Sequence, residues 1–298
     1  MPGLRQVVDG GLSPKVDVVA VHGLNPKGAD AKRHAWETWT AGDKLWLRDE
    51  LPKSFPDARV YLYEYDSRVF SNKPTFSTAA NELLDKLTGA RRKDAASRPL
   101  ILIGHNLGGL LIKQALVNAH NNSRYSHIKD ATVGLMFFAT PHGGGKNREN
   151  VKANLGLTAA SICGFVGFSS TDSIVEAVSP GSVFEDTLTE AFRHQLEAYT
   201  LVSFWGKRDT IVNEASATFG LPGYRETILP LDAAHSDICK FDMASQEDQD
   251  NYVTVENNFS WLFEKCVESI ANQEMETRIQ ALLPTADRAA NKTGSFVR

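Results

Sequence analysis

Residues 99–109 read PLILIGHNLGG and carry the strongest structural signal in the chain. They begin with an unbroken apolar run, which is typical of a strand buried on both faces of a parallel sheet. Helical spacing of apolar residues begins immediately afterwards. A sharp strand–turn–helix connection is therefore predicted, with Asn106 at its centre. Gly104 and Gly108 lie on either side of Asn106, where small residues let the strand and the helix approach closely.

Strand-like and helical patterns alternate through most of the chain. This alternation predicts an α/β fold, in which helices cover both faces of a mostly parallel central sheet. Strands are expected over 16–21, 60–65, 99–104, 132–139, 200–205 and 226–231. Helices are expected over 44–51, 78–87, 107–119, 183–198 and 248–270.

One domain is expected to span residues 1–270. A Gly- and Ser-rich insertion over about 143–182 is interpreted as a small cap within it. The cap contains the most apolar stretch, 155–168, which is too short to cross a bilayer because a spanning helix takes about 20 residues. This stretch is expected to be a buried or cap helix, or else to contact an acyl chain at the mouth of a site. Residues 271–298 turn polar and are expected to form a C-terminal helix and linker tail.

Composition and charge exclude several classes of protein. The 298 residues are 42% hydrophobic and carry a formal net charge of −4, so they lack the basic surplus of a nucleic-acid-binding protein. The 3 cysteines have no zinc-binding spacing, and no metal or organic cofactor is expected. The basic run 91–93 is interpreted as a solvated turn. The N-terminus lacks the apolar segment of a secretion signal, which favours a cytoplasmic location.

The turn around Asn106 has the form G-x-N-x-G, which is the pattern of a nucleophile elbow with asparagine at the nucleophile position. In that arrangement an acid and then a histidine follow on loops after later strands. Asp209 follows the fifth expected strand and His235 follows the sixth. This order predicts that the three side chains meet at the carboxyl end of the sheet, where Asp209 would orient the His235 imidazole. Glu214 is an alternative carboxylate, and turn capping is the alternative role for Asp209.

Two main-chain amides are expected to form an oxyanion hole. One is the N–H of Leu107, which follows the elbow residue and lies at the start of a helix. The other is the N–H of Leu24, in the loop after the first expected strand. Further pocket candidates come from the loops at the same end of the sheet: His22, Gly23, His105 and His142. For His142, packing within its loop is an equal alternative.

Seven separated motifs carry a family resemblance: VHGLNPKG, HAWETWTAGDKLWLRDELP, YLYEYDS, GHNLGGLLIKQALVNAH, ATVGLMFFATPHGGG, SFWGKRDTIVNEASA and LDAAHSDICKF. Together they resemble, in order, the serine esterases of the lipase-like α/β-hydrolase superfamily, from about residue 16 to 261. More narrowly, the chain resembles the hydrolase domain at the N-terminus of fungal NOD-like receptors, where an NB-ARC or NACHT ATPase and repeats follow. The resemblance implies an α/β-hydrolase fold and a small-molecule or lipid ester as substrate. It also implies Asp209 as acid, His235 as base and a serine at the position of Asn106.

Asparagine at this position changes the expected chemistry. A carboxamide has no acidic O–H for His235 to deprotonate, so no acyl-enzyme of the serine type is expected. Three explanations stay open: an introduced inactivating change, a natural pseudoenzyme that keeps the pocket for binding, or conversion of Asn106 to a nucleophilic aspartate. The expected function is a serine-hydrolase scaffold that is inactive with Asn106. The alternative is a non-catalytic ligand-binding or signalling domain of a NOD-like receptor, whose ATPase would lie elsewhere in a longer parent chain because no P-loop is present.

Overall fold

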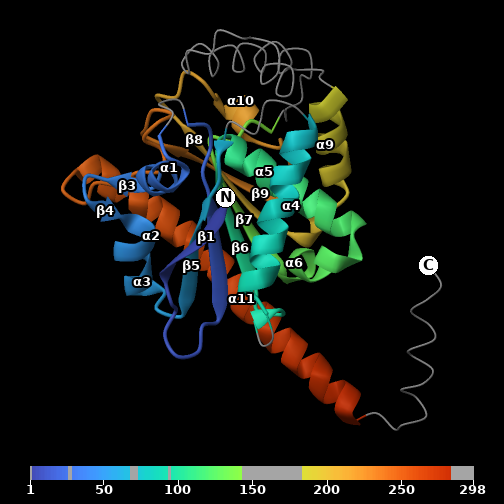
Figure 1. The fold of residues 1–298 in the computed structure, drawn as a ribbon. Helices are drawn as coiled ribbons and strands as arrows, with labels where there is room; N and C mark the ends of the chain where they lie inside the picture. Colours follow the sequence, from blue (N-terminus) through green and yellow to red (C-terminus); the bar gives the residue numbers. More distant parts are fainter. Residues whose placement is uncertain (1, 26–28, 68–72, 93–94, 143–182, 283–298) are drawn as a thin grey trace.

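A seven-stranded sheet runs through the centre of the computed structural model (Figure 1). The structure describes residues 2–25, 29–67, 73–92, 95–142 and 183–282. The strands lie in the order β1-β5-β2-β6-β7-β8-β9, and their bounds are β1 (Gly3–Val8), β2 (Val16–Val21), β5 (Ala58–Glu64), β6 (Leu100–His105), β7 (Thr132–Phe138), β8 (Thr200–Gly206) and β9 (Glu226–Leu231). The edge strand β1 pairs antiparallel with β5, and the other neighbours pair in parallel. This mostly parallel sheet, with a tight turn into a helix after a central strand, has the α/β-hydrolase fold, as expected.

Helices cover both faces of the sheet (Figure 1). One face is covered by α4 (Lys73–Ala90), α5 (Leu107–Asn121), α6 (Ser126–Ala131) and α9 (Val183–Arg193). The other face is covered by α1 (Ala31–Glu37), α2 (Trp46–Asp49), α3 (Leu51–Ser54), α10 (Glu214–Ala217) and α11 (Gln246–Leu282). A short hairpin of β3 (Thr40–Ala41) and β4 (Lys44–Leu45) lies beside α2. Within the described ranges, no helix combines the length and apolar character needed to cross a bilayer.

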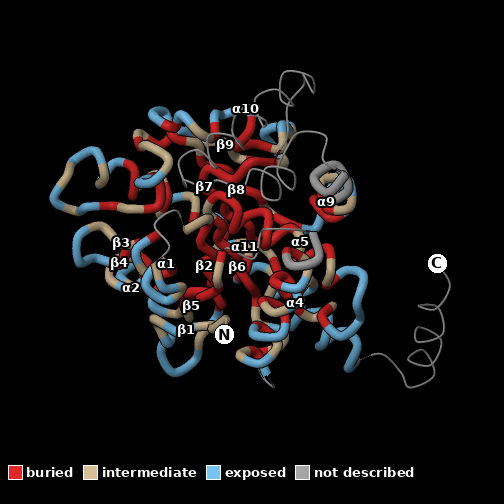
Figure 2. The backbone as a smooth tube through the Cα atoms, turned by 45° about the horizontal axis from the view of Figure 1, so that its top comes forward, coloured by how far each residue is buried: buried red, intermediate tan, exposed pale blue. Residues whose placement is uncertain are grey.

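The strands divide the apolar interior into two cores, one on each face. In β2, Val19 and Val21 belong to the core under α4 and α5, whereas Val18 and Ala20 belong to the core under α11. The division arises because successive side chains of a strand point to opposite faces. Figure 2 shows the central strands buried along their length while the outer sides of the helices are exposed. A strand buried on both faces is continuously apolar, which explains why β6 gave so clear a sequence signal.

All six expected strands are present, and the fold adds one that the sequence did not indicate. Strand β1 lies at the sheet edge with partly exposed residues, so neither an apolar run nor a regular alternation marks it. The helix expected over 44–51 is wrong in its bounds, because β4 takes Lys44 and Leu45, and Pro52 lies in the first turn of α3 instead of ending a helix. Proline fits there because the first turn needs no donor from that residue.

Two expected helices are longer than their patterns indicated. Helix α4 continues through Gly89, and α11 runs without a break to Leu282, where its last residues, from 271 onward, are exposed and project beyond the sheet (Figure 1). The tail expected over 271–298 is therefore helical over its described part. The cap expected over 143–182, with its apolar stretch, lies outside the described residues.

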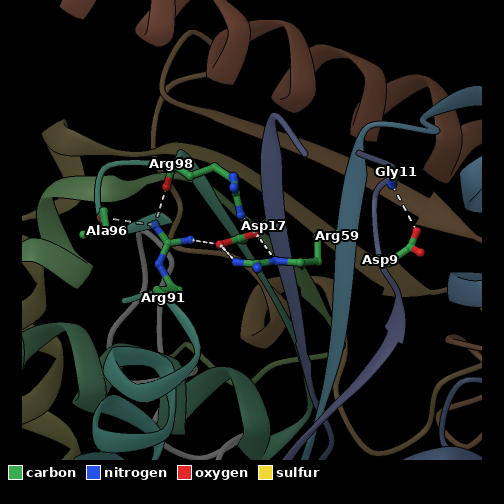
Figure 3. Close-up of polar contacts among 7 residues, drawn as sticks. All are labelled: Asp9, Gly11, Asp17, Arg59, Arg91, Ala96 and Arg98. Atoms are coloured by element: carbon green, nitrogen blue, oxygen red, sulfur yellow. Dashed lines mark hydrogen bonds and ion pairs between the residues drawn. The ribbon is translucent and has the colours of Figure 1, made fainter. Parts of the chain in front are cut away.

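A fully buried carboxylate, Asp17, holds three arginines at the amino end of the sheet (Figure 3). Arg59 binds it through two N–H groups at 2.8 Å each, and Arg98 lies at 3.2 Å. Arg91 contacts the same carboxylate and also donates to the main-chain carbonyl of Arg98. Arg91 is buried, so the interpretation of run 91–93 as a solvated turn is wrong for this residue. Burial lowers the pKa of Arg91.

Asp17→Asn should destabilise the fold by about 3–5 kcal/mol, because three arginine charges would lose their shared partner in a buried place. Urea unfolding followed by tryptophan fluorescence measures this loss. The control is Asp57→Asn, which removes an ion pair with Lys15 of 2.7 Å whose side chains are 55% and 41% exposed. That change should cost less than about 1 kcal/mol. Equal losses for the two variants would contradict a structural role for the Asp17 cluster.

Candidate active site

Asn106 lies in the turn between β6 and α5 with a backbone conformation that residues with a side chain rarely adopt. Its φ is 51° and its ψ is −126°. Such conformations cost about 1–3 kcal/mol and persist only where the surroundings impose them. Here the Asn106 N–H donates to the carbonyl of Phe138 at 3.0 Å, and the Asn106 carbonyl accepts from the N–H of Gly109 at 3.1 Å. Strand β7 and the first turn of α5 therefore fix the turn from both sides.

Glycines let the segments around this turn approach closely. A Cβ atom on Gly108 would lie 2.3 Å from the carbonyl oxygens of Val21 and His22, at the end of β2. A Cβ on Gly104 would lie 2.6 Å from the Cα of Gly109. Both contacts are with main-chain atoms, which cannot rotate away. The glycine pattern seen in the sequence thus corresponds to a real steric requirement.

Two later loops bring Asp209 and His235 to this turn. Asp209 follows β8 and His235 follows β9. The Oδ2 atom of Asp209 lies 2.7 Å from Nδ1 of His235, and the Asp209 side chain is fully buried. The other oxygen, Oδ1, accepts from the N–H groups of Ile211 and Val212 at 2.7 and 2.8 Å. Glu214 is exposed at the start of α10, so the carboxylate that contacts His235 is Asp209.

The two hydrogen bonds of the His235 ring, one to Asp209 and one to Asn106, have a defined direction. Nε2 of His235 lies 2.6 Å from Nδ2 of Asn106. A carboxylate can only accept, so Nδ1 of His235 carries the proton that binds Asp209. In the neutral imidazole Nε2 is then an acceptor, and the Asn106 amide donates to it. The structure therefore joins Asn106, His235 and Asp209 by a continuous series of hydrogen bonds.

The carboxamide oxygen of Asn106 contacts one of the two amides expected in the oxyanion hole. Leu107 N–H donates to Oδ1 at 2.6 Å. Leu107 is the first residue of α5, where N–H groups have no carbonyl partner within the helix and carry a partial positive charge. The second expected amide belongs to Leu24, which is half-buried and packs against the core beside α5. Gly23 reaches the turn closely, since a Cβ on it would lie 2.7 Å from Cβ of Asn106.

Buried aromatic residues hold the loop that carries His22. The His22 ring stacks on Tyr65 with centroids 4.3 Å apart, and the Tyr65 hydroxyl donates to the His22 carbonyl at 2.6 Å. The Nδ1–H group of His22 donates to the carbonyl of Gly23 at 2.8 Å. Burial lowers the pKa of His22 to about 3, so the ring is neutral. Tyr65 and His34 were not predicted as site residues, and the His34 ring packs edge-on against His22. For Tyr65 a signal was present, because it directly follows a strand that ends at this edge.

His105 and His142 lie in different surroundings. His105 Nε2 lies 3.3 Å from the main-chain oxygen of His235, so this residue supports the loop of the histidine. His142 is buried and stacks on Phe219 with centroids 3.8 Å apart, with the Phe137 ring edge-on at 4.6 Å. Neither ring nitrogen of His142 has a hydrogen-bond partner among the described residues. Its contacts favour the packing role over a pocket role.

The described part of the chain contains no group of three or more His, Cys, Asp or Glu side chains that could hold a metal ion. Cys239 and Cys266 are both buried free thiols. The groups that the structure brings together at this site are the His235 imidazole, the buried Asp209 carboxylate and the Leu107 amide.

Comparison with known proteins assigns the chain to a family. Residues 15–166 match the family described as "Putative serine esterase (DUF676)", and the chain belongs to this family. Protein SERAC1 of mouse (Mus musculus) and of human (Homo sapiens) are each 30% identical to it over 159 residues. The aligned region is 45% of this chain and 23% of each relative, so the chain spans about a quarter of the length of these curated relatives.

Solved structures of lipases are also similar to the chain. The lipase BlEst2 of Bacillus licheniformis is 17% identical, with a TM-score of 0.48, over 80% of this chain and 92% of that one. The monoacylglycerol lipase of Paleococcus ferrophilus is 13% identical, with a TM-score of 0.44, over 89% of this chain and 99% of that one.

Gly108→Ala should destabilise the fold by about 1–3 kcal/mol or more, because the added methyl group overlaps main-chain carbonyls of β2. The matched control is Gly89→Ala in α4, where an added Cβ meets no atom within 4 Å. That change should stabilise the protein by about 0.5–1 kcal/mol, since alanine is a better helix former. Thermal and urea unfolding of both variants measure the difference, and a neutral Gly108→Ala would argue against the close approach at the turn.

His142 should make the protein less stable as the pH falls. Burial lowers its pKa well below the ordinary value, whereas in the unfolded chain the pKa is about 6.5. Below that pH the unfolded state binds a proton that the folded state refuses, so the free energy of unfolding falls by about 1.4 kcal/mol per pH unit. His142→Phe keeps the ring contacts and should reduce this slope as the pH falls below about 6.5. His194→Phe, at a side chain 76% exposed, is the control and should leave the slope unchanged.

Proposed function

We propose that this chain is a hydrolase scaffold for carboxylic and lipid esters in which residue 106 blocks acyl transfer. One observation carries the proposal: His235 lies 2.7 Å from the Asp209 carboxylate on one side and 2.6 Å from the elbow side chain on the other. An imidazole held in this way can move a proton between the elbow residue and a substrate. Membership of a serine esterase family supports the same class of reaction.

With serine at position 106 the site would support two-step acyl transfer. The serine oxygen would attack the ester carbonyl while His235 takes its proton, and the amides of Leu107 and Leu24 would bind the oxyanion. His235 would then protonate the leaving alcohol. Water activated by His235 would release the acid and restore the enzyme, with Asp209 stabilising the imidazolium at each stage.

Asn106 removes this chemistry in two ways. Its amide nitrogen donates to Nε2 of His235, so the lone pair needed for proton abstraction is already engaged. Its oxygen accepts from the Leu107 N–H, so a donor for the oxyanion is engaged as well. We therefore expect the chain with Asn106 to be inactive toward esters, because loss of the nucleophile costs several orders of magnitude in rate.

A second candidate is a ligand-binding or signalling domain without catalysis. The observation that favours it is the same double hydrogen bond of Asn106, which satisfies the polar groups of the site without a substrate. In this role the domain would serve a fungal NOD-like receptor in the cytoplasm, joined to an NB-ARC or NACHT domain and repeats in a longer parent chain. Its ligand would occupy the ester pocket and remain intact.

Replacing Asn106 separates the two candidates. Asn106→Ser should hydrolyse p-nitrophenyl esters at least about a thousandfold faster than Asn106→Ser combined with His235→Ala, because the imidazole is required to activate the hydroxyl. A fluorophosphonate should label the single variant covalently and leave the original chain unlabelled. The acyl chain of the ester is varied from acetate to long fatty acids. A folded Asn106→Ser protein that hydrolyses none of these esters would contradict the esterase scaffold and favour the binding role.

A further inference from the structure

The geometry around Asn106 points to a modification site: we propose that the folded protein converts this asparagine to aspartate through a cyclic imide formed with the Leu107 nitrogen. Deamidation of this kind requires the next main-chain nitrogen to reach Cγ, the carbonyl carbon of the side chain. The ψ angles of ordinary helices and strands keep that nitrogen away from Cγ. The turn between β6 and α5 removes this obstacle.

The ψ angle of Asn106 places the two reacting atoms on the same side of the Cα–C bond. It is −126°, and tetrahedral geometry at Cα sets Cβ a third of a turn from the Asn106 nitrogen about that bond. The Leu107 nitrogen is therefore nearly eclipsed with Cβ, which is its position in a five-membered imide ring. Ring closure needs almost no rotation of the main chain, so the turn itself is preserved.

The Leu107 nitrogen is close to the carboxamide and is not committed to the helix. Its N–H donates to Oδ1 of Asn106 at 2.6 Å, and Cγ is bonded to that oxygen. The first N–H groups of a helix such as α5 have no carbonyl partner within the helix. Loss of this proton on cyclisation therefore breaks no main-chain hydrogen bond of α5.

His235 lies where the leaving nitrogen needs a proton. Its Nε2 is 2.6 Å from Nδ2 of Asn106, and Asp209 beside Nδ1 stabilises the imidazolium form. In the step, the Leu107 nitrogen forms a bond to Cγ, the Cγ–Nδ2 bond breaks, and its electron pair leaves with the nitrogen. Nε2 of the neutral His235 imidazole first takes up the proton that leaves the Leu107 nitrogen, and the imidazolium so formed then delivers this proton to Nδ2. The products are a neutral imide and ammonia.

Water opens the imide in a second step. Addition of water to Cγ breaks its bond to the Leu107 nitrogen, restores the peptide N–H and leaves a carboxylate at residue 106 with release of a proton. Addition to the main-chain carbonyl carbon gives isoaspartate instead, which lengthens the chain by a methylene group. The N–H and carbonyl of residue 106 are held by Phe138 and Gly109, which opposes that lengthening. Aspartate is therefore expected to be the major product and isoaspartate the minor one.

The product changes what the site can do. A carboxylate at residue 106 is a nucleophile, which the carboxamide is not, and it would lie beside a histidine able to activate water. The site would mature slowly from a blocked to a reactive form. This catalytic use rests on the proposed function. The deamidation itself does not, because it is measured by the change in peptide mass.

Asn122 provides an internal control. It is exposed and precedes Ser123, and in an unfolded chain a small following residue leaves the nitrogen freer to attack than Leu107 does. In the fold its ψ is 110°, and its Oδ1 accepts from the N–H of Arg124 at 3.1 Å. The following nitrogen thus lies away from the carboxamide. Folding should reverse the order of reactivity of the two asparagines.

The experiment follows both asparagines by peptide mass spectrometry while the protein is incubated in oxygen-labelled water at mildly alkaline pH, either folded or in urea. Asn106 is the sole asparagine in the tryptic peptide 94–113. In the folded protein Asn106 should convert at least about tenfold faster than Asn122, with the imide as intermediate and isoaspartate as a minor product, and in urea the order should reverse. His235→Ala should slow conversion of Asn106 by about tenfold or more and leave Asn122 unchanged.

Two results would overturn the proposal. One is an Asn106 that remains an amide after Asn122 of the folded protein has converted. The other is conversion to aspartate with neither imide nor isoaspartate at any time, which would assign the reaction to direct attack by water. With Asn106→Gln the same attack would have to close a six-membered ring instead of a five-membered one, which is disfavoured, so this variant must keep its amide. Activity of an Asn106→Asp protein toward p-nitrophenyl esters is measured separately, and its absence counts against the catalytic use of the carboxylate and not against the deamidation.

Discussion

The close approach of the β6–α5 turn to the end of β2 is the constraint on which the site depends. Without a side chain at Gly108, the first turn of α5 lies against the carbonyls of Val21 and His22. This contact, with the hydrogen bond from the Asn106 N–H to the Phe138 carbonyl of β7, forces residue 106 into its rare conformation. The side chain of Asn106 is then directed at His235, and the Leu107 N–H is directed at that same side chain. Packing thus determines the chemistry of the loop.

A hydroxyl and a carboxamide differ in how many partners they can satisfy at once. A serine hydroxyl has one proton to donate, which would go to His235 and leave the Leu107 amide for a substrate oxygen. A carboxamide is a donor at one atom and an acceptor at the other, so Asn106 satisfies both groups. Buried polar groups favour such complete pairing. An asparagine at position 106 is therefore compatible with a stable site even though it opposes the reaction expected of a serine esterase.

The fold and the chain order of the site could be predicted because they depend on local patterns. Buried strands such as β6 are continuously apolar, and the loops with Asp209 and His235 follow β8 and β9 in sequence. Strand β1 was not predicted because an edge strand is only partly buried and carries no continuous apolar run. Burial of Arg91 against Asp17 joins residues far apart in the chain and leaves no periodic signal. The double contact of Asn106 depends on side-chain torsions, which spacing along a sequence does not specify.

The Asn106 carboxamide also acts as an intramolecular competitor for the Leu107 amide. Its tether is a single residue, so its effective concentration at the Leu107 amide is high and independent of dilution. A ligand whose carbonyl accepts a hydrogen bond from that amide can bind only when Asn106 has rotated away. Its apparent affinity is therefore its intrinsic affinity multiplied by the fraction of molecules in that state. A ligand held mainly by apolar contacts would escape this penalty. The binding role proposed above would therefore favour ligands held by their acyl chains over ligands held by a carbonyl group.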